Sequence, residues 1–246
     1  MRLAGKRAFV TGGRQGIGLG IVNAFLAQGA EVTTCGRSAR PDDLPQDVAW
    51  FELDVSNATD VTRVRAEVGA TDILVNNAGV QVEKTVVDST DADWDLVMEA
   101  NARGVFNMCR AFIPYMNAGG SIINMSSIAA LLGLSHYLSY SAAKGAIRSM
   151  TKSIAMHCLE AKNNIRCNSI HPGSISTPMV HNALEKLAGF KLMEQDDPER
   201  VRKEMRIGEP LDIANMVLFL VSDESKHMNG AELVIDQGAT IGQPNR

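Results

Sequence analysis

The sequence contains no apolar run long enough to cross a bilayer, which takes roughly 18 to 20 residues. Its longest apolar runs, such as 216–221, are of the size found in protein cores. Near the N-terminus, the apolar run 8–10 stops at Thr11-Gly12-Gly13 and is far too short for a secretory signal. We therefore expect a cytoplasmic protein that does not associate with membranes.

The chain also lacks a cationic excess and has few aromatic residues. It has 24 Lys and Arg against 28 Asp and Glu, a formal net charge of −4, and only 7 Phe, 2 Trp and 3 Tyr. Nucleic-acid binding depends on cations that neutralise phosphates, and often on stacked aromatic rings. No nucleic-acid partner is therefore expected.

Cysteine is scarce as well, and its pattern argues against a metal site. The four cysteines form no C-x-x-C pair, and no histidine cluster at zinc-ligand spacing accompanies them. We interpret Cys35, Cys109, Cys158 and Cys167 as small buried apolar residues and predict no bound metal.

What the sequence does contain is a regular alternation of short apolar runs with amphipathic stretches. Strands are expected at 7–10, 31–35, 48–54, 72–75, 121–125, 165–170 and 233–235. Helices are expected at 16–28, 58–68, after Thr90, at 139–160 and at 211–222. Strands that alternate with helices and read as continuous apolar runs predict a parallel sheet covered on both faces. The fold class is therefore a doubly wound α/β domain, which we assign to residues 1–246.

The segment at about 178–206 fits this pattern poorly. It is charged, contains Pro198 and has only patchy helical periodicity. It is either a disordered excursion or a lid over a site. Its apolar residues favour the lid, and these are Met179, Leu184, Leu187, Phe190, Leu192 and Met193.

A glycine-rich turn, 11–18, stands between the first expected strand and the first expected helix. Its glycines Gly12, Gly16 and Gly18 allow a tight turn and a close approach to a pyrophosphate, whose charge the helix dipole favours. Many such turns use glycine for conformation alone, but the placement here indicates dinucleotide binding. Three residues separate Gly12 from Gly16, whereas the usual fingerprint G-x-G-x-x-G has one between its first two glycines.

The pattern T-G-x-x-x-G-x-G resembles the cofactor turn of the short-chain dehydrogenase/reductase family, and the other family motifs follow in order along nearly the whole chain. They are Asn76-Asn77-Ala78-Gly79, Asn101-Ala102-Arg103-Gly104, Ser127 thirteen residues before Tyr140, Tyr140-x-x-x-Lys144, and Pro172-Gly173 with Thr177. The resemblance implies a seven-stranded Rossmann-type sheet and nicotinamide-dependent hydride transfer. It also implies a homotetramer or a homodimer.

Tyr140 and Lys144 support this chemistry from their spacing alone. Residues four apart on a helix project from the same face. A tyrosine has a pKa of about 10, and a nearby ammonium in a poorly solvated cleft helps to lower it. Tyr140 is then a general base for alcohol oxidation and a general acid for ketone reduction. The alternative is an exposed Tyr and Lys pair on an ordinary helix, and the flanking motifs favour the catalytic interpretation.

The remaining catalytic roles come from the resemblance. Ser127 is expected to hold the substrate oxygen, and Lys144 to bind the nicotinamide ribose hydroxyls as well. Asn101 is expected to position a water that relays protons to Lys144. An Asn in a helical segment can instead simply bond to backbone, and this alternative stays open.

The resemblance also implies a set of cofactor contacts. Asp54 and Val55 are expected at the adenine, and Ile175 and Thr177 at the nicotinamide carboxamide. The full set comprises Gly12, Arg14, Gln15, Gly16, Ile17, Gly18, Arg37, Ser38, Asp54, Val55, Asn77, Ala78, Gly79, Tyr140, Lys144, Pro172, Gly173, Ile175 and Thr177.

The residues after the second expected strand favour NADP over NAD. Gly36 stands where NAD-preferring relatives have Asp, and Arg37 and Ser38 follow it. An arginine can neutralise the 2′-phosphate, which a carboxylate would repel. Arg14 and Arg40 are expected to add positive potential. Gln15, however, stands where many NADP-using relatives have a basic residue, so NAD stays possible, with Arg37 as a solvated surface residue.

These observations predict an NADP(H)-dependent secondary alcohol dehydrogenase or ketone reductase. The expected substrate is an apolar ketone or alcohol, in a pocket walled by Leu131, Leu132, Leu134, His136, Tyr137 and Met179. An NAD-dependent catabolic dehydrogenase and a 3-oxoacyl reductase are alternatives with the same catalytic residues. A non-catalytic cofactor-binding regulator is a further alternative, but the chain keeps the complete acid/base set.

Overall fold

The computed structural model describes residues 1–242, and a single parallel sheet organises them. Its strands within these residues are β1 (Arg7–Thr11), β2 (Glu31–Gly36), β3 (Ala49–Glu52), β4 (Thr71–Asn76), β5 (Met116–Met125), β6 (Arg166–Pro172) and β7 (Glu232–Ile235). Their order in the described sheet is β3-β2-β1-β4-β5-β6-β7, and every neighbouring pair is parallel. The predicted doubly wound α/β fold is confirmed.

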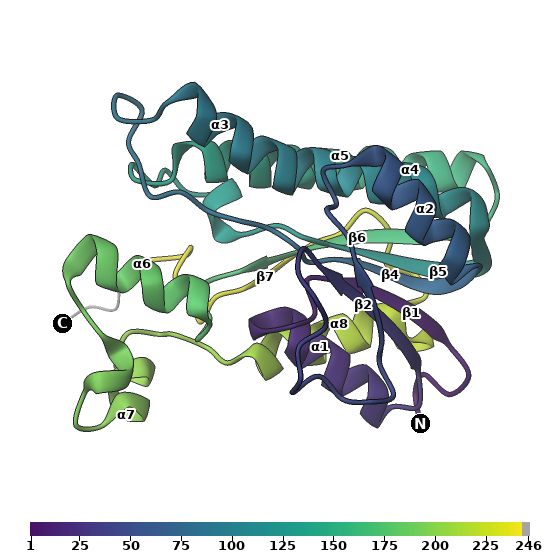
Figure 1. Ribbon diagram of the computed structural model, residues 1–246, viewed down its shortest axis with the longest axis horizontal. Coiled ribbons are helices and arrows are strands. Elements are labelled where there is room, and N and C mark those ends of the chain that lie inside the picture. The colour runs from purple at the N-terminus through teal and green to yellow at the C-terminus, as the bar shows by residue number, and fades with distance from the viewer. Residues whose placement is uncertain (243–246) are drawn as a thin grey trace.

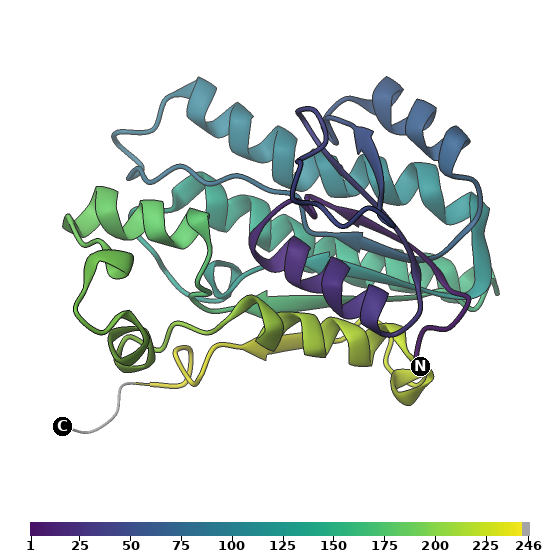
Figure 2. The ribbon, with the colours of Figure 1, turned by 60° about the horizontal axis from the view of Figure 1, so that its bottom comes forward.

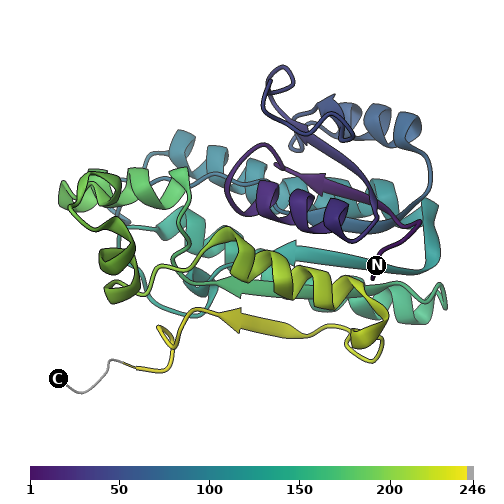
Figure 3. The ribbon, with the colours of Figure 1, turned by 90° about the horizontal axis from the view of Figure 1, so that it is seen from below.

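Helices cover both faces of the sheet (Figure 1). On one face lie α2 (Ala58–Val68), α3 (Asp91–Val97), α4 (Gly104–Phe112) and α5 (Leu138–Glu160). On the other lie α1 (Gly16–Ala27) and α8 (Pro210–Val221), which pack side by side, as Figure 3 shows from below. No helix in residues 1–242 is long and apolar enough to span a membrane.

The core follows from the alternation of side chains along each strand. Phe9, Leu74, Ile122 and Cys167 occupy matching positions in four adjacent strands and pack in the cluster that includes α4 and α5. Their chain neighbours, such as Val10, face the opposite cluster with α1 and α8. Successive residues of a strand point to opposite faces, so both faces need apolar side chains. The four cysteines are buried, as predicted, and all four are free thiols.

The long helical region expected after Thr90 is interrupted. Its start is as predicted, because the Thr90 hydroxyl accepts from the Asp93 backbone while the Asp93 side chain accepts from the Thr90 backbone. A π-helical turn then runs over Met98–Arg103 before α4 resumes at Gly104. A π turn is a local widening that periodicity does not reveal, and such turns often mark functional sites. This one carries Asn101.

The segment 178–206 forms two α-helices joined by a stretch with a 3-10 turn, so the alternative of a disordered excursion does not hold. They are α6 (Pro178–Ala188) and α7 (Pro198–Glu204), each begun by a capping side chain, Thr177 or Asp197, followed by proline. The periodicity is patchy because two short helices replace one long one. Figures 1 and 2 both place α6 and α7 beyond the carboxyl ends of the strands.

Candidate active site

A cavity of about 1230 Å³ opens at the carboxyl ends of the strands. In doubly wound sheets ligands bind at this edge, where the strand order reverses, here between β1 and β4. Small-molecule pockets commonly measure about 300–1,000 Å³, so this one has room for more than one small ligand. All nineteen predicted cofactor residues line it, and so does Ser127.

The glycine-rich turn has the shape that a phosphate site needs. Gly12 and Gly16 have φ values of +71° and +55°, in the left-handed region that favours glycine. A Cβ on Gly18 would lie 2.2 Å from the Gly12 carbonyl oxygen. At the start of α1, Gln15 makes no side-chain capping bond, and the first turn holds no acidic residue. Backbone N–H groups at this helix end therefore remain available to an anion, which fits a bound pyrophosphate.

Asn77 ties the end of β4 to this turn. Its amide nitrogen Nδ2 donates to the carbonyls of Thr11 and Gly12, at 3.0 and 3.2 Å. Its backbone N–H donates to the Thr11 hydroxyl at 2.9 Å, and so does that of Ala78. Asn77 lines the cavity, but its side-chain amide nitrogen is bonded to the glycine-rich turn and holds that turn in place.

At the end of β2, two of the three arginines expected around the phosphate reach the cavity. Arg14 and Arg37 line it, and Arg14 donates to the Ser38 hydroxyl at 2.8 Å. Arg40 does not line the cavity, so its expected contribution to the potential there stays a prediction. Its guanidinium donates to the carbonyls of the following loop, including that of Pro45 at 2.7 Å. A Cβ on Gly36 would lie 2.7 Å from the Trp50 ring.

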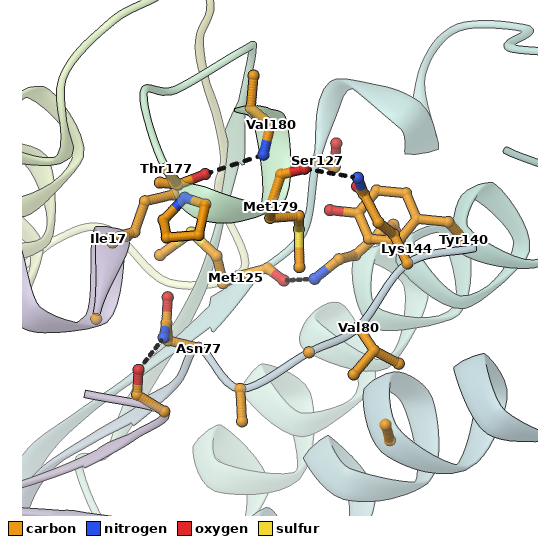
Figure 4. A pocket seen from close by; sticks show the side chains of 18 of the residues that line it. Ile17, Asn77, Val80, Met125, Ser127, Tyr140, Lys144, Thr177, Met179 and Val180 are labelled. Atoms are coloured by element: carbon orange, nitrogen blue, oxygen red, sulfur yellow. Dashed lines mark hydrogen bonds between the residues drawn. The ribbon is translucent and has the colours of Figure 1, made fainter. Parts of the chain in front are cut away.

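Ser127, Tyr140 and Lys144 meet on one side of the cavity, opposite Ile17 and Thr177 (Figure 4). Ser127 follows β5, whereas Tyr140 and Lys144 lie one turn apart on α5. The Lys144 ammonium is buried, donates to the Met125 carbonyl at 2.7 Å and lies 5.4 Å from the centre of the Tyr140 ring. The predicted convergence of these three side chains is therefore present.

The sequence led us to expect a lowered pKa for Tyr140, and the structure gives a raised one. Burial raises the pKa of the Tyr140 phenol to about 12, and the neighbouring Ser127 hydroxyl offsets part of this rise. Burial also lowers the pKa of Lys144 to about 8. The expected lowering of the Tyr140 pKa is absent because the Lys144 ammonium is directed at a carbonyl and desolvation of the phenol dominates. In the protein alone, Tyr140 carries its proton at neutral pH.

Asn101 uses its side chain on backbone. It is fully buried on the π turn, accepts from the Val80 N–H at 2.8 Å and donates to the Val80 carbonyl at 2.9 Å. It lies behind the cavity wall, and a Cβ on Gly79 would be 2.9 Å from its Oδ1 and 3.7 Å from the Lys144 ammonium. Asn101 therefore fixes the loop that passes Lys144, and the water relay stays a prediction.

Only some of the residues expected to form the substrate pocket line the cavity. Leu134, Tyr137 and Met179 line it, but Leu131, Leu132 and His136 do not. Unforeseen lining comes from Leu96, Glu99 and Ala100 near the π turn. The loop after β4 holds α6, since Gln81 donates to the Met179 carbonyl at 3.2 Å and Lys186 pairs with Glu83 at 3.0 Å. This last contact spans 103 residues, so no sequence pattern reveals it.

Comparisons with known proteins show what the whole chain is similar to. Residues 12–240 match a family model described as enoyl-(acyl carrier protein) reductase. An NADP-dependent (R)-specific alcohol dehydrogenase of Lentilactobacillus kefiri is 40% identical, over 97% of this chain and 98% of the relative. A 3-beta-hydroxysteroid dehydrogenase of Comamonas testosteroni is 38% identical, over 96% of each chain. The crystal structure of a short chain dehydrogenase family protein from Francisella tularensis matches with a TM-score of 0.86 at 28% identity, over 96% of this chain and 99% of that one.

Replacing Asn101 with Ala should loosen the loop after β4. The change leaves the backbone N–H and carbonyl of Val80 without partners, and each such loss costs about 1–3 kcal/mol. We expect lower stability against urea and faster hydrogen exchange at the Val80 amide. Asn117→Ala, which removes an exposed bond to Asp72, is the control and should leave the exchange unchanged. Equal protection of Val80 in Asn101→Ala and the native protein would contradict this role.

Proposed function

The chain belongs to the short-chain dehydrogenase/reductase family and is an NAD(P)-dependent oxidoreductase acting on CH–OH groups, and from this we propose that it transfers hydride between NADP(H) and an apolar ketone or secondary alcohol. The observation that carries the proposal is the meeting of Ser127, Tyr140 and Lys144 in the cavity that also holds the glycine-rich turn. An acid/base pair and an anion site in one cavity are what nicotinamide chemistry requires.

The residues present fit a dinucleotide. The uncapped start of α1 and the glycine turn would bind the pyrophosphate. Residues of the segment from Pro172 to Thr177 line the opposite end of the cavity. The buried ammonium of Lys144 faces the same space and would bind the ribose hydroxyls. When bound, the nicotinamide exchanges a hydride with the substrate carbon and, in its oxidised form, carries a positive charge.

The proton passes through Tyr140. With its pKa raised to about 12, the phenol is protonated at neutral pH and is ready to donate to the oxygen of a ketone. The Ser127 hydroxyl supplies a second donor to the same oxygen. In the oxidation direction Tyr140 would take the proton from the alcohol, and the positive charge of an oxidised nicotinamide would favour the phenolate that this step needs.

Charge at the end of β2 supports NADP(H) as the cofactor. Residues 36–40 contain two arginines and no acidic residue. Arg37 and Arg14 both line the cavity, and Arg14 is already bonded to Ser38. The ring of Trp50 fills the space beside Gly36 that a carboxylate would need. The alcohol dehydrogenase of Lentilactobacillus kefiri, described as NADP-dependent, is a relative with the same preference.

The substrate end supports an apolar ketone, and we propose that α6 acts as its lid. This end is lined by Leu96, Leu134, Tyr137, Met179, Val180, Leu184 and Leu187. Such a surface suits an alicyclic, aromatic or steroid-like ketone, and the hydroxysteroid dehydrogenase relative is consistent with this class.

We also propose that the chain forms a homotetramer or a homodimer. Large apolar side chains stay exposed along α4 and α5, namely Phe106, Met156 and Leu159, at 44%, 52% and 61%. Exposed apolar side chains in such numbers are typical of a surface covered by another subunit.

Replacing Tyr140 with Phe should abolish turnover while cofactor binding is retained. Loss of a general acid typically costs about 10²- to 10⁴-fold in rate. Ketone reduction, followed by nicotinamide absorbance, should fall by this factor, while NADPH affinity from a fluorescence titration stays within about twofold. Tyr137→Phe, in the same cavity but without a lysine four residues on, is the matched control. Full activity of Tyr140→Phe would exclude the assigned mechanism.

Replacing Arg37 with Ala should weaken NADPH binding and leave NADH binding unchanged. A hydrogen bond to a charged group contributes about 1.5–3 kcal/mol, so an exposed one should give a loss of about tenfold in affinity. Arg40→Ala is the control, since Arg40 bonds only to loop carbonyls within residues 1–242. Equal affinities for NADPH and NADH in the native protein would remove this assignment.

The pH dependence of ketone reduction should follow Lys144. Its pKa of about 8 means that the ammonium predominates at neutral pH and is lost as the pH rises through that value, whereas Tyr140 stays protonated up to about 12. The kcat/KM for reduction reports groups of the free enzyme, so it should fall above about pH 8. The exposed Lys152→Met should keep the same profile. A flat profile between about pH 7 and about pH 9 would show that Lys144 does not set the rate.

A further inference from the structure

A buried histidine outside the cavity lining lies directly behind Ser127. His171 is the penultimate residue of β6, next to Pro172, and is fully buried. Its Nδ1 lies 3.2 Å from the Ser127 backbone carbonyl, and its Nε2 lies 3.0 Å from the Ser169 hydroxyl. A buried polar ring without partners would destabilise the fold, so these contacts define what it does there.

The partners determine which nitrogen carries the proton. A carbonyl oxygen only accepts, so Nδ1 must donate to Ser127. In the neutral ring Nε2 is then an acceptor, and the Ser169 hydroxyl donates to it. The other acceptor within reach of Ser169 is the Ala231 carbonyl, at the longer distance of 3.4 Å. Burial lowers the pKa of His171, which keeps the ring neutral and this tautomer in place.

The segment Met125-Ser126-Ser127 is fixed from two sides. On the α5 side, Met125 accepts from the Lys144 ammonium, and the Ser126 hydroxyl donates to the Lys144 carbonyl at 2.9 Å. On the sheet side, the Ser126 N–H donates to the Ile170 carbonyl at 2.8 Å.

For Ser127 itself, the described chain gives one bond to the sheet, the one from His171. The other bonds of Ser127 come from the turn that follows it. The Ala129 N–H donates to its hydroxyl at 3.1 Å, and the Ala130 N–H donates to its carbonyl at 3.0 Å. Those bonds would move with the turn. The bond from His171 ties the Ser127 backbone to β6. The same strand ends at Pro172, at the proposed nicotinamide end of the cavity.

We propose that His171 is a positioning residue, which holds Ser127 at the angle from which its hydroxyl reaches the substrate oxygen. The proposal rests on the role of Ser127 in the proposed function. It assigns to His171 no contact with substrate or cofactor. An apolar residue of similar size would fill the same volume, so the specific contribution of the imidazole is the N–H directed at Ser127.

Two substitutions separate this role from simple packing. His171→Leu removes the donor, whereas His171→Asn keeps an N–H at about the position of Nδ1. We expect His171→Leu to lower kcat/KM for ketone reduction by about 3- to 10-fold, the worth of one neutral hydrogen bond. NADPH affinity should stay unchanged, and His171→Asn should recover most of the activity. Equal losses in both variants, or a loss shared with NADPH affinity, would overturn the proposal.

A double-mutant cycle then asks whether the effect passes through Ser127. In a Ser127→Ala background, His171→Leu should have no further effect on kcat/KM, because no hydroxyl remains to be positioned. The same fold-loss in both backgrounds would indicate a general structural role and contradict positioning. If Ser127→Ala itself leaves activity unchanged, the proposed function of Ser127 fails first. If Ser127→Ala lowers activity and His171→Leu does not, only the present inference fails.

A measurement on the native protein covers the case in which His171→Leu does not fold. With ¹⁵N-labelled histidine, NMR should show one of the five histidines fixed as the tautomer with Nδ1 protonated and Nε2 unprotonated. The signal is assigned by its absence in His171→Asn. A proton on Nε2, or averaging between the two tautomers, would show that the bond to Ser127 is not maintained.

Discussion

The site depends on the way β1 and β4 are joined where the strand order reverses. These strands pair in parallel, and beyond them the chain leaves in opposite directions across the sheet. The buried hydroxyl of Thr11 links the ends of the two strands. It donates to the Val75 carbonyl at 3.3 Å and accepts from the N–H groups of Asn77 and Ala78. The glycine turn and the loop toward Lys144 therefore start from one fixed point.

From that point the catalytic side is built largely by bonds to backbone. Lys144 is anchored on a carbonyl of β5, and Asn101 is anchored on both polar groups of Val80. Buried polar groups are tolerated when they are satisfied, and here the same bonds fix the positions of Lys144 and of the loop after β4. The result is a buried Tyr140 with a raised pKa beside a buried Lys144 with a lowered one, which is the arrangement that the proposed proton donation needs.

The sequence was informative where function depends on local spacing. The succession of strands and helices and the glycine turn followed from periodicity and short motifs, whereas the meeting of Ser127 with Tyr140 and Lys144 followed from the family resemblance that those motifs carry. It was uninformative where a property depends on the surroundings. The direction of the Tyr140 pKa is set by burial, and the turning of Arg40 is set by carbonyls of its own loop. The π-helical turn that carries Asn101 does not show in the spacing of apolar residues along the sequence.

The contact between Gly36 and Trp50 bears on how this protein can change over evolutionary time. A carboxylate after the second strand is a direct way to select the unphosphorylated cofactor. Here a Cβ at position 36 would lie 2.7 Å from the Trp50 ring, so a carboxylate there requires the ring to move. The packing between β2 and β3 therefore bears on which side chains position 36 can accept.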